Sequence, residues 1–555
     1  MYKDPDRIIR AFQEAKQLRS GEESDWRAAA AHCLPRHYGA WQSFESPSAL
    51  NGSSAAAARL IAVDITAAKA VPVYTSVLQR LATPRSQMWH NLQPSNPDLL
   101  RYRRVELYFA ELNRLLWQQR YHPRARFSTA QTENYVGVGV YGNGVKFISS
   151  RKRRPGERRG GLLYRSPPLM HIYVLRDDEG EITHFFRAMW LNARQFKLKF
   201  PGVTPPPSIE QELEKQLGPS ESTLFLILHL VCPNDQDHDP DRIDYRRFKY
   251  ASVYVSEKDR SLIGEPSGYA EKPYVLSRTF TEPDGTYGFS PALRALGAMG
   301  SLSAMKRTLL KAGQKAVDPV LLAHDDGIIS GRKDLRPGAV MFGGVDAQGR
   351  ELVKTLQTGN FVLAEKMMEA EKRDVEDVFL VTLFQILMDN PQMTATQVME
   401  NIAEKAALVA PTLERLQEED IGPTIERELS VLGEENLLPE MPGELIEAEG
   451  EYELIHTSPM SKAQASEESA GFMRLSEFTA AAAETQQNPR LMRRLNFDKA
   501  IPAMARTANV PPEWLRSDEE LAAEDDQQQQ ERDIQTAIEA APAVAGLAKA
   551  VSANR

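Results

Sequence analysis

The sequence is poor in cysteine and has no long hydrophobic run. Cys33 and Cys232 are the only cysteines in 555 residues, so neither a disulfide framework nor a cysteine zinc site is supported. This predicts folding in a reducing cytosol. The longest apolar run, residues 224–232, is too short to span a bilayer and predicts a buried strand. The first residues lack a signal-peptide pattern, and we expect no membrane partner.

Common enzyme motifs are also missing. The chain has no Gly-x-x-x-x-Gly-Lys-Ser/Thr phosphate loop, no His-Glu-x-x-His and no Gly-x-Ser-x-Gly elbow. Gly137 and Gly139 lie in a strand-like pattern without a following helix, which weakens a dinucleotide-binding interpretation. We therefore expect no catalytic residues and no cofactor.

Two metal-like features are weak. Residues 235–241 are rich in aspartate, as a calcium loop is, but Pro240 stands where that loop needs glycine and Arg246 where it needs glutamate. A solvated acidic loop is favoured, and no metal site is predicted. His229 lies inside the apolar run and is interpreted as a hydrogen-bonded core histidine.

The composition is that of an ordinary soluble protein, with 42% hydrophobic and 26% charged residues. The length predicts two to four packed units. A net charge of −9 argues against general coating of nucleic acid, although local patches can still be basic.

The order of patterns predicts an α+β protein. Residues 1–130 have mainly helical periodicity, and residues 130–285 are strand-rich. Residues 135–142 and 145–148, joined by Asn143-Gly144, have the pattern of a β-hairpin. Further strands are expected at 170–176, 183–190, 223–232, 251–255 and 274–279.

Two long helices of opposite charge bias follow. Ser290 and Pro291 predict the start of a helix that runs to residue 317 and contains five basic residues and no acid. Its small apolar residues recur in steps of three and four, as in a heptad seam. Residues 320–353 are expected to form a small β element. The helix at 360–388 is acidic.

A kinked helix is expected next. Asn390-Pro391 ends the acidic helix, and Thr394 with Gln397 forms a capping box for the next one, which runs to about residue 432. We predict kinks at Pro411, Gly422 and Pro423. An acidic connector at 434–453, a helical region to about 526 and a low-complexity tail at 527–555 complete the chain.

Two basic features have no assigned role from sequence. The first is a turn, which either is simply exposed or contacts phosphate or an acidic partner; it contains Arg151, Lys152, Arg153, Arg154, Arg158 and Arg159. The second is a stripe at spacing four on the 291–317 helix, formed by Arg307, Lys311 and Lys315. The stripe can join subunits or face DNA, and we favour pairing with the acidic helix.

These segments together resemble the portal, or head-to-tail connector, proteins of short-tailed bacteriophages (podovirus type). The resemblance covers nearly the whole chain, and its order and spacing make it specific. The matching segments are Asp64-Ile-Thr-Ala67, Leu81-Ala-Thr-Pro-Arg-Ser86, Trp89-His-Asn-Leu92, Tyr287-Gly-Phe-Ser-Pro-Ala292, Asn390-Pro-Gln-Met-Thr-Ala-Thr-Gln-Val-Met399, Ile421-Gly-Pro-Thr-Ile-Glu-Arg427, Thr457-Ser-Pro-Met460 with Ala463-Gln464, and Asn509-Val-Pro-Pro512 with Arg516-Ser-Asp-Glu-Glu520.

The resemblance implies a portal fold and a ring, usually of twelve copies, at one capsid vertex. DNA would enter through its channel, pumped by a terminase, and leave through it on infection. The implied partners are other copies of the chain, double-stranded DNA, terminase, the major capsid and scaffolding proteins, and a tail adaptor. The implied location is the virion, after synthesis in the host cytoplasm.

The family plan also divides the chain into parts. It implies a wing at 1–289, helical to 130 and then strand-rich, stem helices at 290–317 and 360–388, a clip at 318–359, a tunnel loop at 389–395, a kinked helix at 396–432, and a helical crown region at 433–526. The residues expected to face the channel are Met388, Asp389, Asn390, Pro391, Gln392, Met393 and Thr394.

Two other classes of function compete with this interpretation. A packaging enzyme is disfavoured because the phosphate loop and a convincing metal cluster are missing. A monomeric or weakly oligomeric nucleic-acid-binding protein is disfavoured by the acidic net charge and the lack of a recognisable reading module.

Overall fold

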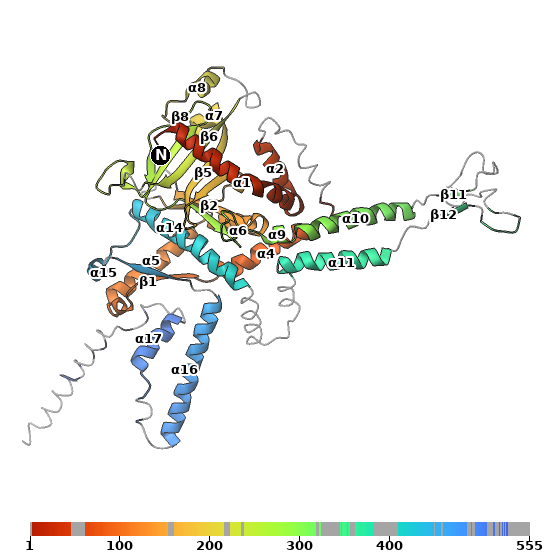
Figure 1. Ribbon diagram of the computed structural model, residues 1–555. Coiled ribbons are helices and arrows are strands. Elements are labelled where there is room, and N and C mark those ends of the chain that lie inside the picture. Colours follow the sequence, from red (N-terminus) through yellow and green to blue (C-terminus); the bar gives the residue numbers. More distant parts are fainter. Residues whose placement is uncertain are drawn as a thin grey trace, which may run out of the picture. The chain divides into compact units, whose positions relative to one another are not determined.

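The structure, a computed structural model, divides the chain into two compact units (Figure 1). Unit 1 comprises residues 1–82, 126–149 and 163–430, and unit 2 comprises residues 83–125, 150–162 and 431–555. No helix among the described residues has the length and apolar character needed to cross a membrane. The structure describes residues 3–45, 62–151, 153, 160–215, 223–234, 238–317, 321–323, 345, 347–351, 353–355, 361–381, 409–448, 450–456, 459–485, 490, 494–507, 514, 516, 521, 524, 527 and 529–530.

An antiparallel sheet is the centre of unit 1. Its strands pair in chain order, with the short β9 (Ser267–Tyr269) added beside β7. Four strands of this sheet were expected and are confirmed, with small changes at their ends, whereas the short β8 was not predicted. The strands are β4 (Ile172–Arg176), β5 (Ile182–Asn192), β6 (Leu224–Pro233), β7 (Tyr250–Ser256) and β8 (Ser261–Leu262).

Helices cover both faces of this sheet. On one face, Ile8, Phe12 and Ala15 of α1 (Pro5–Cys33) pack against alternate strand residues such as Phe186 and Leu228. On the other face, Phe196 of α7 (Ala193–Lys199) and Ile209 of α8 (Pro207–Glu214) are buried with the opposite set of strand residues. Because successive side chains of a strand point to opposite faces, each strand contributes residues to two separate cores.

The β-hairpin predicted at 135–148 is wrong. Residues before Gly142 form a helix, α6 (Phe127–Tyr141), which ends at Gly142 in the left-handed region at φ 76°. The strand β2 (Asn143–Ser150) then pairs with β10 (Tyr274–Arg278), and β3 (Leu162–Arg165) joins the same sheet.

Close packing explains the helix in spite of its strand-like sequence. The helix α4 (Thr66–Ala82) packs on α6. A Cβ on Gly139 would lie only 2.9 Å from the Tyr74 ring of α4. A Cβ on Gly137 would lie 2.7 Å from the Asn143 carbonyl oxygen. The two glycines admit neighbours that a longer side chain would exclude, so tertiary packing overrides local propensity.

We expect Gly137→Ala to lower the free energy of unfolding by about 1–3 kcal/mol, because the new methyl group overlaps backbone that cannot move away. Gly21→Ala is the matched control, because a Cβ at this exposed position in α1 meets nothing within 4 Å. It should stabilise the protein by about 0.5–1 kcal/mol. Denaturant unfolding of the two variants measures both effects, and equal effects would contradict the packing explanation.

Unit 2 contains a two-stranded sheet and several helices. The strands β1 (His90–Pro94) and β13 (Tyr452–His456) pair antiparallel, although the sequence analysis placed no strand at 452–456. Trp89 and Leu92 are buried, and the Arg120 guanidinium lies 4.3 Å from the Trp89 ring centroid. The helices are η2 (Pro97–Arg101), α5 (Arg103–Arg120), α15 (Gly443–Glu447), α16 (Pro459–Thr485) and α17 (Phe497–Thr507).

Candidate functional site: the helix pair and the buried π-helical turn

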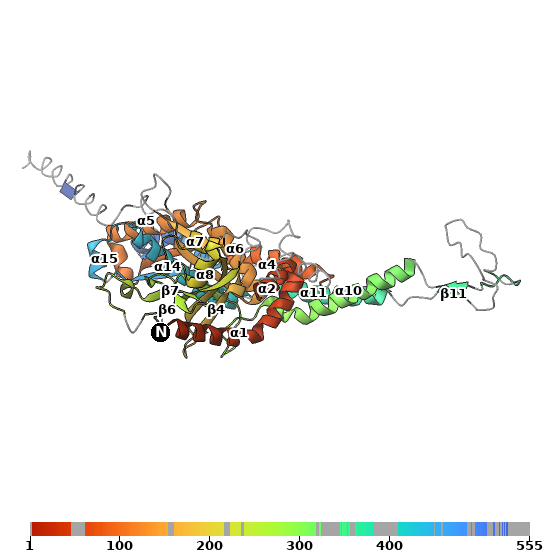
Figure 2. The ribbon, with the colours of Figure 1, turned by 90° about the horizontal axis from the view of Figure 1, so that it is seen from above.

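The two long helices of opposite charge bias lie side by side in unit 1 (Figures 1 and 2). The first starts at Ser290, whose hydroxyl accepts a hydrogen bond from Leu293 N (2.9 Å) and donates one to Val140 O (2.8 Å). After a break at Ala295 the helix continues. These helices are α9 (Pro291–Arg294), α10 (Leu296–Val317) and α11 (Phe361–Val378), and α10 packs against α11.

The predicted small-residue seam of α10 is buried only near its start. Of the seam residues, Ala295 and Leu302 are buried and Ala316 is exposed, and the others are half-buried: Ala298, Met305, Leu309 and Ala312. The far part of α10 therefore keeps accessible surface within one subunit. Between α10 and α11 in sequence, the predicted β element is represented by β11 (Leu321–Ala323) and β12 (Val353–Thr355), which pair antiparallel.

Charged side chains lie along the helix pair. The basic stripe residues Arg307, Lys311 and Lys315 are all exposed. Another α10 base, Lys306, donates to the Asp64 carboxylate (2.9 Å). On α11, Arg373 pairs with Glu369 (3.0 Å) and Lys372 with Glu376 (3.7 Å), each within the helix.

The kinked helix is described from Val409. Residues 388–394, predicted to face the channel, lie outside the described residues. The helix is continuous from 409 to 416, and the predicted Pro411 kink falls in its first described turn. Gln417–Ile421 then forms a π-helical turn, followed directly by α14 (Gly422–Glu434). The π turn, which adds one residue to the helical turn, lies directly before Gly422 and Pro423, where a kink was predicted.

A fully buried carboxylate lies in the π turn. Asp420 is 0% exposed and forms an ion pair with Lys146 of β2 at 2.8 Å. Its oxygens also accept hydrogen bonds from Gln131 (2.7 Å), Asn134 (3.3 Å) and Ser277 (2.7 Å). Lys146 in turn donates to Gln131 Oε1 at 2.8 Å. A buried charge pair with this many partners ties the π turn to α6, β2 and β10.

Further ion pairs hold the same helix. Glu419 accepts from the Arg278 Nε (3.0 Å), Nη2 (2.8 Å) and backbone N (3.1 Å), and from Arg415 at 3.2 Å. Arg415 also donates to Thr281 (2.7 Å). The bidentate guanidinium–carboxylate geometry fixes orientation as well as position.

Sequence reasoning missed this buried network. The available signals were the acidic pair Glu419-Asp420 at the phase shift of an apolar stripe, and Lys146 within an apolar strand. A charged residue at a position whose pattern predicts burial indicates a buried partner. The sequence alone does not show which residues are the partners, because they are 274 residues apart.

The basic turn is held within unit 2 by Glu435. The Glu435 carboxylate accepts hydrogen bonds from Ser150 Oγ (2.5 Å), Gly160 N (2.9 Å) and Arg153 (2.8 Å). These hydrogen bonds lower the pKa of the Glu435 carboxyl group, and the one from Ser150 contributes most. Arg151 lies 2.9 Å from His122 Nδ1. Lys152, Arg154, Arg158 and Arg159 lie outside the described residues.

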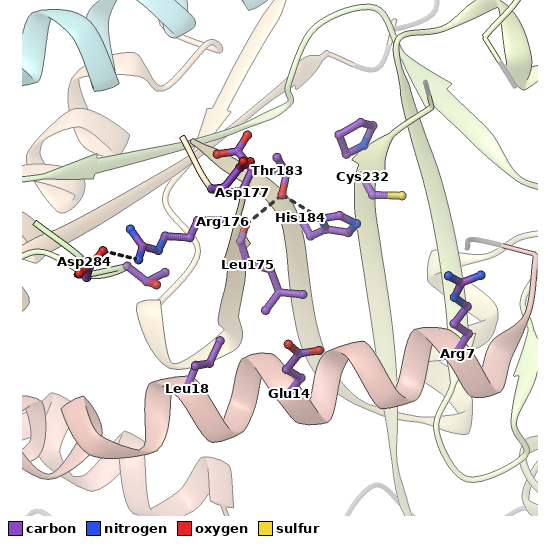
Figure 3. Close-up of a pocket in the computed structure, with 13 residues that line it drawn as sticks. Arg7, Glu14, Leu18, Leu175, Arg176, Asp177, Thr183, His184, Cys232 and Asp284 are labelled. Carbon is purple, nitrogen blue, oxygen red and sulfur yellow. Dashed lines mark hydrogen bonds and ion pairs between the residues drawn. The ribbon is translucent and has the colours of Figure 1, made fainter. Parts of the chain in front are cut away.

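A cleft of about 830 Å³ lies beside α1 in unit 1 (Figure 3). Glu14 and Leu18 of α1 face Leu175, Thr183 and other residues of β4 and β5 across it. Acidic and basic side chains both line the cleft, and its ion pair between Arg176 and Asp284 spans 3.5 Å. Within the cleft, the Thr183 hydroxyl lies 3.0 Å from His184 Nδ1.

The histidine predicted to belong to the core does so. His229 is 1% exposed, and its ring nitrogens lie 2.8 Å from Tyr274 Oη and 3.0 Å from Ser252 Oγ. Within the described part of the chain, no group of three or more His, Cys, Asp or Glu side chains is placed to hold a metal ion. Cys33 and Cys232 are both buried, and neither forms a disulfide.

Comparison with known proteins identifies the class. The model of the family described as bacteriophage head to tail connecting protein matches residues 5–515. The class is that of structural connectors between phage head and tail, which are not enzymes. This chain belongs to the bacteriophage head-to-tail connecting protein family, and the resemblance to portal proteins seen in the sequence is confirmed.

Two curated relatives are similar along much of their length. The "Portal protein" of Salmonella phage epsilon15 is 24% identical over 526 residues, covering 93% of this chain and 90% of the relative. The "Probable portal protein" of Bordetella phage BPP-1 is 24% identical over 393 residues, covering 69% and 67%. A solved structure, the neck of an empty GTA particle computed with C6 symmetry, is 11% identical with a TM-score of 0.33, covering 73% of this chain and 84% of that one.

Family membership fixes the coarse function. The chain is a portal connector, a structural component of the virion at the head–tail junction, and it acts as a homo-oligomeric ring rather than as an enzyme.

Proposed function

We propose that twelve copies of this chain form the ring, and that double-stranded DNA passes through its axial channel during packaging and ejection. The match of the connector family to residues 5–515 is the observation that carries this proposal. In it, a terminase docks on the ring during packaging and a tail adaptor afterwards, while scaffolding and major capsid proteins surround it. The chain is made in the host cytoplasm.

The parts of the chain have separate roles in this proposal. Residues 1–289 form the wing, and α10 and α11 belong to the two stem segments, 290–317 and 360–388. Residues 318–359 form the clip, and 389–395 the tunnel loop. The kinked helix at 396–432 leads to the crown region at 433–526. The Asp420 network supports a fixed attachment of the kinked helix to the wing, because Asp420 lies on that helix and Lys146 in the wing.

The tunnel loop assignment predicts contact with DNA. Met393→Cys, labelled with a cysteine-directed photo-crosslinker, should crosslink packaged DNA, because residues 388–394 would face the lumen. Labelling should be selective, because Cys33 and Cys232 are buried. The matched control is Asp241→Cys, at an exposed position in the proposed wing. Particles that package DNA normally but show no crosslink from position 393 would refute the assignment.

The basic stripe is proposed to join subunits rather than to grip DNA. Each phosphate held by a lysine or arginine adds salt-dependent affinity, which would oppose sliding of DNA through the channel. Exposed pairs contribute only about 0–1 kcal/mol each, but a ring repeats them at every interface. Arg307, Lys311 and Lys315 are exposed in one subunit, where the acidic α11 of a neighbour can approach them.

A further inference from the structure

A row of polar side chains crosses the sheet of unit 1 on the face that α7 and α8 cover. Arg187 of β5 lies opposite His229 of β6, and His229 lies opposite Tyr254 of β7. Directly opposed residues project to the same face of a sheet. The His229 and Tyr254 rings are stacked, with centroids 4.3 Å apart and planes 9° apart. The side chains of this row are therefore held in fixed positions on that face of the sheet.

Two more cations converge on this row from other elements. Lys199, the last residue of α7, has its ammonium nitrogen 5.5 Å from the Tyr254 ring centroid and 2.6 Å from Met189 Sδ. Arg165, the last residue of β3, is exposed and close enough to interact electrostatically with Lys199 and Tyr254. Arg187 is half-buried, and its Nε is buried without a hydrogen-bond partner.

The charges around this row are nearly all of one sign. Burial is the main cause that lowers the pKa of Lys199 to about 7, and the positive charges of Arg187 and Arg165 add to it. Burial also lowers the pKa of His229 well below its ordinary value, and the positive charges of Lys199 and Arg187 act in the same direction. Apart from tyrosines, the ionisable side chains that shift the pKa values of Lys199, His229, Tyr254 and Tyr274 are all cations. Three like charges held together indicate that an anion completes the site.

We propose that Arg165, Arg187 and Lys199 bind a phosphate group above the His229–Tyr254 stack. Two guanidinium groups and an ammonium from three different elements offer donors from several directions, which suits a tetrahedral oxyanion better than a planar carboxylate. Arg165 is exposed, so the ligand can enter from solvent on its side of the site. The phosphate can belong to a nucleic-acid backbone or be free phosphate, and the chemistry of recognition is the same.

The proposal predicts that Lys199 lowers stability until the anion binds. The pKa of Lys199 is lower in the folded state than in the unfolded chain. Between about pH 7 and pH 10.5 the unfolded state therefore binds more protons at Lys199, so the stability of the fold rises with pH across that window. Lys199→Met should therefore raise the Tm at pH 7 in a buffer without phosphate. A purely structural lysine would give the opposite result, because its removal would lower the Tm.

The test compares the full-length protein with Lys199→Met and Arg165→Gln, and with Lys197→Met as the control on an exposed position of the same helix. Inorganic phosphate and a short DNA duplex are added in separate arms at constant ionic strength. We expect at least one of them to raise the Tm of the wild type and of Lys197→Met, and to leave the other two variants unchanged. A response to DNA alone assigns the site to a nucleic-acid backbone, and a response to both assigns it to any accessible phosphate. Equal responses in all four proteins, no response in the wild type, or a lower Tm for Lys199→Met without phosphate would overturn the proposal.

Discussion

Replacing Lys146 by methionine is expected to lower the free energy of unfolding by about 3–5 kcal/mol, the usual cost of removing one partner from a buried ion pair. Asp420 would keep its hydrogen bonds from Gln131, Asn134 and Ser277 but would lose its only adjacent cation among the described residues. Both side chains are almost fully buried, so water cannot replace the missing charge. Denaturant unfolding of the purified chain measures the loss.

The double variant Lys146→Met with Asp420→Leu is the matched control. Removing both charges leaves no buried ion, so most of the lost stability should return, and the two changes should be strongly non-additive. Asn134 and Gln131 would still need partners, so full recovery is not expected. A loss below about 1 kcal/mol for Lys146→Met alone would show that the pair does not anchor the π turn.

Reversing the basic stripe is expected to weaken assembly. Changing Arg307, Lys311 and Lys315 together to glutamate replaces attraction to the acidic α11 of a neighbour by repulsion. At about 0–1 kcal/mol for each exposed pair, the three changes should cost up to about 3 kcal/mol at each interface. That raises the protein concentration needed for assembly by up to about 100-fold. Analytical ultracentrifugation at low salt measures the shift, which should shrink as salt is added.

Reversing Glu369 and Asp377 to lysine in the same protein should partly restore assembly. The rescue will be incomplete, because Glu369 also pairs with Arg373 within its own helix. The subunit-joining role would be wrong if the triple variant assembled normally but failed to package DNA, because the stripe would then face the channel.

Patterns of burial made much of unit 1 predictable. The strands β4 to β7 and the long helices have strong periodicity, and the Ser290-Pro291 signal marked the start of α9 correctly. These features depend on residues close together in sequence. The family was predictable too, because the matching segments keep their order along the chain.

The features that sequence reasoning missed depend on distant contacts. Residues 135–142 alternate like a strand, but in the structure they form a helix in which Tyr74 and Asn143 closely approach two glycines. The predicted kink at Gly422 and Pro423 lies directly after the π turn, but the burial of Asp420 was not predicted, because Lys146 and Ser277 come from other parts of the chain. The row that joins Arg187 to His229 likewise depends on strand register, which the sequence does not fix.

The mass of the assembled protein tests the central claim most directly. Native mass spectrometry of the purified full-length chain, supported by negative-stain images, reports how many 62.2 kDa subunits associate and whether they close. We predict a single closed ring, of twelve copies. A well-folded chain that remained monomeric at every protein and salt concentration tested would contradict the account.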